Sequence, residues 1–153
     1  MTMATADECL VVARLEGLAE AIAFVESFCA DRGVAASDGL RLSLVVEELF
    51  TNTVVHGHGG GSDAPVRLVL RADSSHLELS YEDSAPPFDP VAHAARSPVD
   101  PAAAVADRPI GHLGLALVVD MAERISYLRL DDRNRILLAL RREAELNTPD
   151  DPA

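Results

Sequence analysis

The sequence predicts an α+β protein, a two-layer α/β sandwich in which helices cover one face of a mixed, mostly antiparallel sheet. Segments with the 3.6-residue periodicity of amphipathic helices are interspersed with short segments in which apolar and polar residues alternate. The alternating segments come in pairs separated by polar turns, which is typical of antiparallel hairpins. A chain of 153 residues suits one core, so we expect a single domain over residues 1–142 and a polar tail over 143–153.

The charge balance argues against nucleic-acid and membrane partners. The chain has 13 basic and 25 acidic residues, and its formal net charge of −12 repels phosphate backbones and anionic membrane surfaces. A bound nucleotide would therefore depend on Mg²⁺, backbone N–H groups and a few local arginines. No stretch approaches the ~20 apolar residues of a membrane span and no signal region is evident, so the expected location is cytoplasmic.

The first third of the chain predicts one strand and two helices. Residues 8–14 read as a short strand, and residues 15–32 have apolar side chains at helical spacing. Ser37 or Asp38 can cap the second helix, whose pattern continues to the glycine cluster that begins at Gly57. This second helix is the longest periodic segment of the chain.

A hairpin and a proline-rich segment occupy the middle of the chain. Residues 66–72 and 76–83 alternate around a polar turn and predict two paired strands. Six prolines lie between residues 84 and 110. We therefore expect a loop or lid there, without regular structure over most of its length.

The last third predicts a helix and a second hairpin. An apolar helix is expected from near Gly111 to about Glu123. Residues 125–130 and 135–140 then predict two strands joined by a polar turn at 131–134. With the earlier elements, this order needs only one sheet and one domain.

A polar stripe on the second predicted helix is the first candidate site. Glu48, Asn52 and His56 are spaced by four, so they share one side of the helix and border its apolar face. A carboxamide oxygen can hold Mg²⁺ on nucleotide phosphates, and a carboxylate one turn away can accept a proton from an attacking hydroxyl. Taken alone, the same pattern also fits an ordinary exposed helix face.

Two further features lie at the ends of predicted elements. Asp83 ends a strand, where its carboxylate can accept from the exocyclic amine of adenine and would oppose the oxygen of guanine. Gly111 and Gly114 open an apolar helix, where free N–H groups can approach a phosphate. Each feature alone has a structural alternative, a turn-forming Asp in the first case and a packing device in the second.

Three motifs resemble one family in their order along the chain. EELFTNTVVH resembles the N-box of the GHKL, or Bergerat-fold, ATPases; EDSAPPFDP resembles their adenine-binding box, and GHLGLALV their Gly box. The resemblance spans about residues 36–140. The small size and the PPFDP sequence look most like the bacterial anti-sigma-factor serine/threonine kinases, which contain a histidine-kinase-like ATPase domain.

The resemblance implies a role for each matching residue of the N-box. Glu48 would be the general base, Asn52 the Mg²⁺ ligand, and His56 a neighbour of the ATP site. In the adenine box, Asp83 would bind the base beside Ala85. The family usually has Asp-x-Gly where this chain has Asp83-Ser84-Ala85.

The Gly box is implied to hold the phosphates of ATP. The resemblance assigns this contact to the backbone from Gly111 through His112 and Leu113 to Gly114. Arg108, just before the box, is expected near the γ-phosphate.

As a whole, the resemblance implies a kinase that transfers the γ-phosphoryl group of ATP to a Ser or Thr of a STAS-type anti-sigma-factor antagonist. Such a protein would also regulate a sigma factor and can form a homodimer. The departure at Ala85 keeps open an alternative, a non-catalytic nucleotide-binding switch module that binds a regulatory partner protein. A kinase domain acting on a separate His-bearing protein is a third hypothesis.

Overall fold

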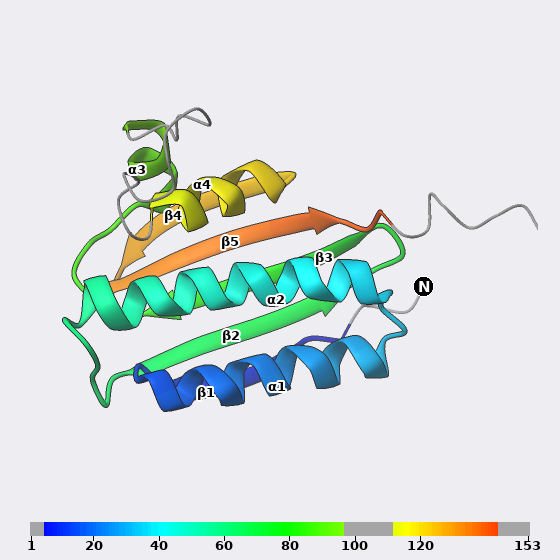
Figure 1. The fold of residues 1–153 in the computed structure, drawn as a ribbon, viewed down its shortest axis with the longest axis horizontal. Helices are drawn as coiled ribbons and strands as arrows, with labels where there is room; N and C mark the ends of the chain where they lie inside the picture. The colour runs from blue at the N-terminus through cyan, green and yellow to red at the C-terminus, as the bar shows by residue number, and fades with distance from the viewer. Residues whose placement is uncertain (1–4, 97–111, 144–153) are drawn as a thin grey trace, which may run out of the picture.

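The computed structural model describes residues 5–96 and 112–143, which form two layers (Figure 1). The predicted elements are present with small shifts at their ends, and one short helix was not predicted. In chain order the elements are β1 (Asp7–Val12), α1 (Leu15–Asp31), α2 (Ala36–Thr51), the π-helical turn η1 (Asn52–Gly57), β2 (Pro65–Ala72), β3 (His76–Asp83), α3 (Pro90–Arg96), α4 (His112–Met121), β4 (Arg124–Leu130) and β5 (Arg133–Arg141).

The strands form one five-stranded sheet in the order β1-β2-β3-β5-β4. Every described pairing is antiparallel, so the predicted mixture of parallel and antiparallel strands is wrong in this detail. Because the last hairpin inserts β5 beside β3, β4 becomes the edge strand. This order also places Asn134, at the start of β5, directly opposite Asp83, at the end of β3.

The core lies between one face of the sheet and the layer formed by α1, α2 and α4 (Figure 1). Apolar positions recur every second residue along the strands and every three or four along the helices, so both layers present a continuous apolar face. Each fully buried Leu or Phe side chain contributes roughly 1.5–3 kcal/mol. The largest of these buried side chains are Phe28, Leu42, Leu49, Phe50, Leu68, Leu70, Leu77, Leu79, Tyr81 and Leu140.

The start of α2 differs from its prediction. The residue before the helix is Ala35, and no side chain caps it, so the predicted capping by Ser37 or Asp38 is wrong. Asp38 is instead buried in the first turn, where its carboxylate accepts from Arg41 Nη1 at 3.1 Å and from the backbone N–H of Glu143 at 3.1 Å. The carboxylate therefore ties the helix start to the end of the sheet.

Helix α3 lies within residues 84–110, where mostly irregular structure was predicted. The Asp89 carboxylate accepts from the N–H groups of Val91 at 2.9 Å and Ala92 at 3.2 Å, and Pro90 occupies the first helical position. Asp followed by Pro is a recognised helix start, and the high proline content obscured it. Residues 97–111 lie outside the described part of the chain.

The hairpin between β4 and β5 is tighter than predicted. Only Asp131 and Asp132 form the turn, with φ of 52° and 61°. Two successive left-handed residues match the right-handed twist of the flanking strands. Arg133 and Asn134, predicted in the turn, therefore belong to β5.

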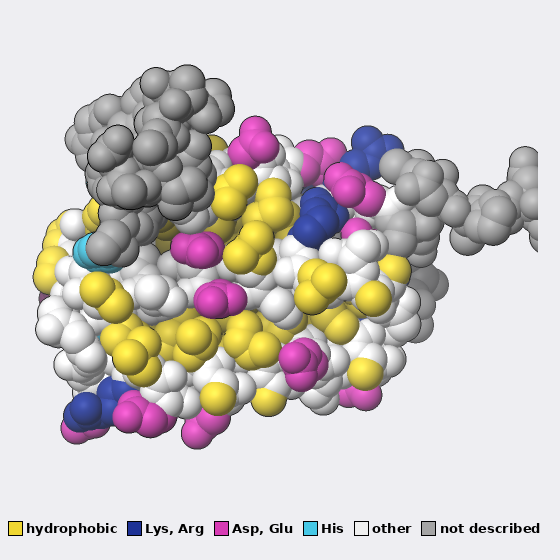
Figure 2. Space-filling view, viewed as in Figure 1, with side chains coloured by type: hydrophobic (Ala, Val, Ile, Leu, Met, Phe, Trp, Pro, Cys, Tyr) yellow, Lys and Arg dark blue, Asp and Glu magenta, His cyan; other side chains and the backbone are white. Residues whose placement is uncertain are grey.

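The two faces of the molecule differ in character. Figure 2 shows apolar side chains along the helical layer, with few basic ones among them. On the other face, Glu82 is almost buried, and it accepts from Arg133 Nη1 at 2.9 Å and from Arg135 Nη2 at 2.8 Å. Burial opposes the charge of this carboxylate, but the two guanidinium groups outweigh that effect and lower the pKa of Glu82. The ion pairs join β3 to β5 beside Asp83.

Within residues 5–96 and 112–143, no helix has the length and apolar character needed to cross a membrane.

Candidate functional site

The site begins where α2 changes into the π-helical turn η1. The N–H of His58 donates to the carbonyl of Thr53 at 3.0 Å, five residues back, in place of the four-residue spacing of an α-helix. Three glycines then reverse the chain in left-handed conformations, at Gly59, Gly60 and Gly61. Such π-turns are frequent at functional sites.

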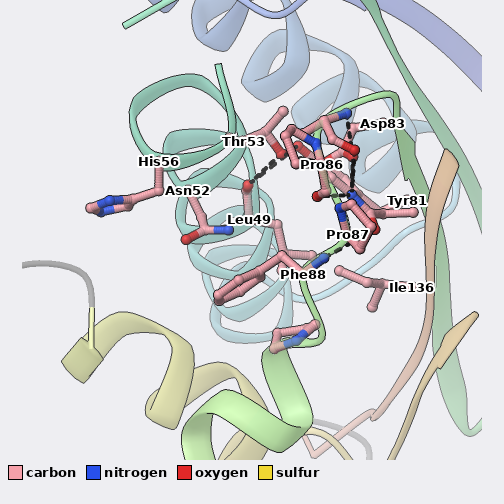
Figure 3. Close-up of a pocket in the computed structure, with 14 residues that line it drawn as sticks. Leu49, Asn52, Thr53, His56, Tyr81, Asp83, Pro86, Pro87, Phe88 and Ile136 are labelled. Carbon is pink, nitrogen blue, oxygen red and sulfur yellow. Dashed lines mark hydrogen bonds between the residues drawn. The ribbon is translucent and has the colours of Figure 1, made fainter. Parts of the chain in front are cut away.

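A cavity of about 120 Å³ opens beside this turn (Figure 3). Its walls come from α2 and η1, from the end of β3, from the proline-containing loop after β3 and from β5. Both polar and apolar side chains line it. The lining residues are Leu49, Asn52, Thr53, His56, Gly57, Tyr81, Asp83, Ala85, Pro86, Pro87, Phe88, Pro90, Asn134 and Ile136.

Asp83 is the buried carboxylate of this cavity, with 8% of its surface exposed. Its Oδ2 accepts from Thr53 Oγ1 at 2.7 Å, and its Oδ1 accepts from Asn134 Nδ2 at 2.8 Å and from the Ala85 N–H at 3.2 Å. Three donors from three parts of the fold therefore compensate its burial and hold its orientation.

Thr53 connects Asp83 to the core. Its hydroxyl lies 2.7 Å from the Tyr81 hydroxyl and 3.0 Å from the carbonyl of Leu49. Burial raises the pKa of Tyr81 well above its usual value, so Tyr81 keeps its proton and can donate it to Thr53. Thr53 can then donate its single proton to Asp83. Figure 3 shows these side chains converging from the helix and from the strand.

Thr53 and Asn134 are site residues that the sequence did not single out. In the sequence, Thr53 lies within the apolar pattern of a predicted helix, and Asn134 belongs to a predicted polar turn. Neither residue therefore carries a local signal of function. The register of β3 against β5 and the approach of η1 to β3 bring both to Asp83.

Asn52 and His56 both line the cavity, but their surroundings differ. Asn52 is partly buried, whereas His56 is exposed, and its ring extends away from the other labelled residues (Figure 3). The wider π-turn between the two residues changes the four-residue spacing on which the single polar stripe was predicted.

Glu48 does not line the cavity and lies instead against α4. A Cβ atom on Gly114 would overlap its carboxylate, so this glycine leaves room for the Glu48 side chain. Burial is the main cause of a raised pKa of Glu48, and the neighbouring charge of Glu47 adds to it. This contact therefore joins the beginning of the predicted N-box to the predicted Gly box.

The remaining predicted residues divide between the described and undescribed parts of the chain. His112 and Leu113 form the first turn of α4 ahead of Gly114, and their side chains lie outside the described part. Arg108 and Gly111 lie wholly outside it.

Ala85, which replaces the glycine usual in the adenine box, is buried against η1. A Cβ atom at Gly57 would lie 2.8 Å from the Ala85 methyl group. Gly57 has no left-handed backbone, so lack of space requires a glycine there, and conformation does not. The methyl group at position 85 is thus accommodated by the absence of one at position 57.

An antiparallel sheet covered by helices on one face, with a polar cavity between a helix end and the end of a central strand, defines the class of histidine-kinase-like ATPase folds. The chain belongs to this family. Residues 11–140 match the family model described as the histidine kinase-like ATPase domain.

The chain resembles several solved structures. A chain of the SiaB–SiaC complex from Pseudomonas aeruginosa is 14% identical, with a TM-score of 0.60 and coverage of 88% of both chains. The catalytic domain of the histidine kinase ThkA is 13% identical, with a TM-score of 0.49 and coverage of 92% of this chain and 98% of that one. At this identity the first similarity supports the fold alone. No curated protein sequence matches the chain.

Proposed function

We propose that the protein is an ATP-dependent serine/threonine kinase that phosphorylates an anti-sigma-factor antagonist and so regulates a sigma factor. The observation that carries the proposal is the buried Asp83 carboxylate in a cavity that Asn52 also lines, with Glu48 four residues before Asn52 on the same helical segment. Membership of the histidine-kinase-like ATPase family supports ATP as the nucleotide.

Asp83 is the proposed adenine ligand. Its carboxylate is an acceptor, so it favours the exocyclic amine of adenine over the oxygen of guanine. The cavity of about 120 Å³ is well below the ~300 Å³ at which pockets for whole ligands begin. We therefore assign the cavity to the base, beside Ala85, and propose that Asn52, Arg108 and the Gly box contact the phosphates.

Glu48 is the proposed general base. In the reaction, Glu48 accepts the proton of a Ser or Thr hydroxyl while that oxygen bonds to the γ-phosphorus of ATP and the bond to the ADP oxygen breaks. A raised pKa makes the carboxylate a stronger base and keeps it suited to proton transfer. Asn52 offers a hard oxygen ligand for Mg²⁺, which would neutralise charge on the phosphates.

The proposed partners are proteins. The similar SiaB chain was solved in a complex with a second protein, SiaC, which supports a protein partner for the present chain as well. We propose a STAS-type antagonist as the phosphate acceptor, a sigma factor as the regulated partner, and a homodimer as the working form in the cytoplasm.

Calorimetry of Mg-dependent ATP and GTP binding tests the nucleotide site. Wild type is expected to bind ATP selectively, and Asp83→Asn is expected to lose that selectivity, because the amide can turn a donor toward the base. Asp89→Asn is the matched control, because Asp89 lies in the same loop but does not line the cavity, and Asn also caps helices well. Absence of binding by wild type would refute the proposal.

Phosphotransfer from labelled ATP to a candidate antagonist then tests the catalytic part. Glu48→Gln is expected to bind ATP and to transfer phosphate at least about a hundredfold more slowly, in line with the usual contribution of a general base. Nucleotide binding without any transfer by wild type would remove the kinase activity from the proposal.

A second function, a non-catalytic nucleotide switch, is favoured by one observation. Ala85 is 3% exposed in the cavity wall and stands where the family usually has glycine. A narrowed base pocket that binds and releases nucleotide slowly suits a switch more than a turnover enzyme. In that case Glu48→Gln would leave partner binding intact, whereas Asp83→Asn would abolish its dependence on ATP.

A further inference from the structure

Asn134 is the most fully hydrogen-bonded side chain of the cavity. It is 4% exposed, and it stands at the start of β5, directly opposite Asp83 in the sheet. Its amide contacts Asp83, the loop after β3 and the edge strand β4. A buried side chain with this many hydrogen bonds either stabilises the fold alone or also positions its neighbours for binding.

The nitrogen of the Asn134 amide faces only acceptors. Nδ2 donates to Asp83 Oδ1 at 2.8 Å, to the carbonyl of Ala85 at 3.1 Å and to that of Pro86 at 3.0 Å. An amide has two N–H bonds, so one of them is shared between two acceptors.

The oxygen of the same amide faces donors. Oδ1 accepts from the Tyr127 hydroxyl at 2.6 Å, from Arg129 Nη1 at 3.2 Å and from the Phe88 N–H at 3.3 Å. The two ends of the amide therefore cannot be exchanged, because the exchange would set its nitrogen against the donors of Arg129 and Phe88 and its oxygen against the Asp83 carboxylate. At this length only asparagine supplies a donor on one side and an acceptor on the other.

We infer that Asn134 is a positioning residue that sets the base selectivity of the nucleotide site by holding Asp83 and the loop through Phe88 in one arrangement. The inference rests on the proposed function. Asn134 and Thr53 each hold one oxygen of the Asp83 carboxylate, so its remaining acceptor capacity has a defined direction. Arg129 reinforces the same loop, since its Nη1 donates to the Ala85 carbonyl at 2.8 Å.

Substitution Asn134→Asp distinguishes a positioning role of Asn134 from a purely structural one. Aspartate keeps the shape and the acceptor on the Tyr127 side, but it replaces the donor with an oxygen that faces the Asp83 carboxylate. Two adjacent carboxylates share a single proton when the pH is low enough, and they repel each other when both are ionised. The defect should therefore depend on pH.

Other charged groups near position 134 are few among the described residues. Arg129 and the Tyr127 phenol face it from β4, and His56 of η1 lines the same cavity. Arg129 and His56 are present in wild type and variant alike. The ratio of variant to wild-type dissociation constants at each pH removes the contribution of His56 and of the ATP phosphates.

The experiment measures ATP and GTP binding by wild type, Asn134→Asp and Asn134→Ser at pH 5.5 and pH 8. At pH 8 we expect Asn134→Asp to bind ATP about ten- to a hundredfold more weakly than wild type, and to recover much of this loss at pH 5.5. The Asn134→Ser variant should lose selectivity for ATP over GTP to the same extent at both pH values. Tyr127→Phe is the control, because it removes one hydrogen-bond donor to Asn134 without adding charge. Its loss of ATP affinity should be smaller than that of Asn134→Asp and should not depend on pH.

The possible results distinguish a failure of the proposed function from a failure of the role assigned to Asn134. Absence of nucleotide binding by wild type refutes the proposed function. Selective ATP binding by wild type, together with unchanged selectivity in a folded Asn134→Ser or a pH-independent defect in Asn134→Asp, overturns the role of Asn134. Circular dichroism at both pH values establishes that each variant is folded.

Discussion

Substitution Gly114→Ala should affect activity far more than stability. Gly114 is the third residue of α4, and its Cα faces the Glu48 carboxylate so closely that a methyl group there would overlap it. The group that must yield is the end of a flexible side chain, and the backbone of α2 can stay in place. The carboxylate of the proposed base is therefore displaced while the packing of the two helices is kept.

The expected change in stability is a small difference between two opposing effects. Replacing glycine by alanine within a helix favours the helical state by up to about 1 kcal/mol. Forcing Glu48 out of its present rotamer costs about 0.5–1.5 kcal/mol. The free energy of unfolding should therefore stay within about 1 kcal/mol of wild type. A displacement of about 1 Å at a reacting group can reduce the rate about a hundredfold.

Urea denaturation and single-turnover phosphotransfer measure these two quantities. We expect Gly114→Ala to unfold close to the wild-type midpoint, to bind ATP with similar affinity, and to transfer phosphate about a hundredfold more slowly. In a Glu48→Ala background the overlap is absent, so the same substitution should stabilise the protein by up to about 1 kcal/mol. This second background is the matched control for the helix-propensity effect.

Three results would refute this reasoning. A loss of more than about 2 kcal/mol in the wild-type background alone would show that the carboxylate cannot move aside. A wild-type transfer rate would show that the position of Glu48 does not matter for the chemistry. Equal effects of Gly114→Ala in both backgrounds would mean that the two residues are not coupled.

Two further predictions concern charge and space at the same site. The raised pKa of Glu48 means that the folded protein binds its proton more tightly than the unfolded chain, so this stabilisation is complete below about pH 4.5 and is lost as the pH rises through the folded pKa. Glu48→Gln should therefore be more stable than wild type at pH 7 and gain less at pH 4 in urea denaturation; a gain that is larger at pH 4 would contradict the sign. Gly57→Ala should destabilise the protein by about 1–3 kcal/mol, because its methyl group would lie 2.8 Å from that of Ala85. Ala85→Gly should restore most of that loss in the double variant, and purely additive effects in the thermodynamic cycle would disprove the contact.

Local patterns in the sequence were enough to predict most elements and part of the site. Helical and alternating periodicities depend on residues a few positions apart, so they located both hairpins and three of the four α-helices. The short helix α3 was missed because its Asp89 cap and Pro90 start stand within a run of prolines. The π-turn was missed because no local pattern distinguishes it from a continued α-helix.

The candidate site was predictable to the extent that its residues lie in contiguous motifs. Asn52, His56, Asp83 and Ala85 line one cavity, as their motifs suggested. Glu48 lies outside that cavity, and its contact with Gly114 joins residues that are far apart in the chain.

By itself, the sequence determined the class of the protein, because periodicity and three short motifs are local properties of the chain. The tertiary structure alone decided what surrounds Asp83. Thr53 and Asn134 lie 30 and 51 residues away along the chain, and they meet Asp83 only because β5 pairs with β3 and η1 packs against that strand. Hydrogen-bond partners at such separations depend on strand order and register, which follow from the packing of the whole core.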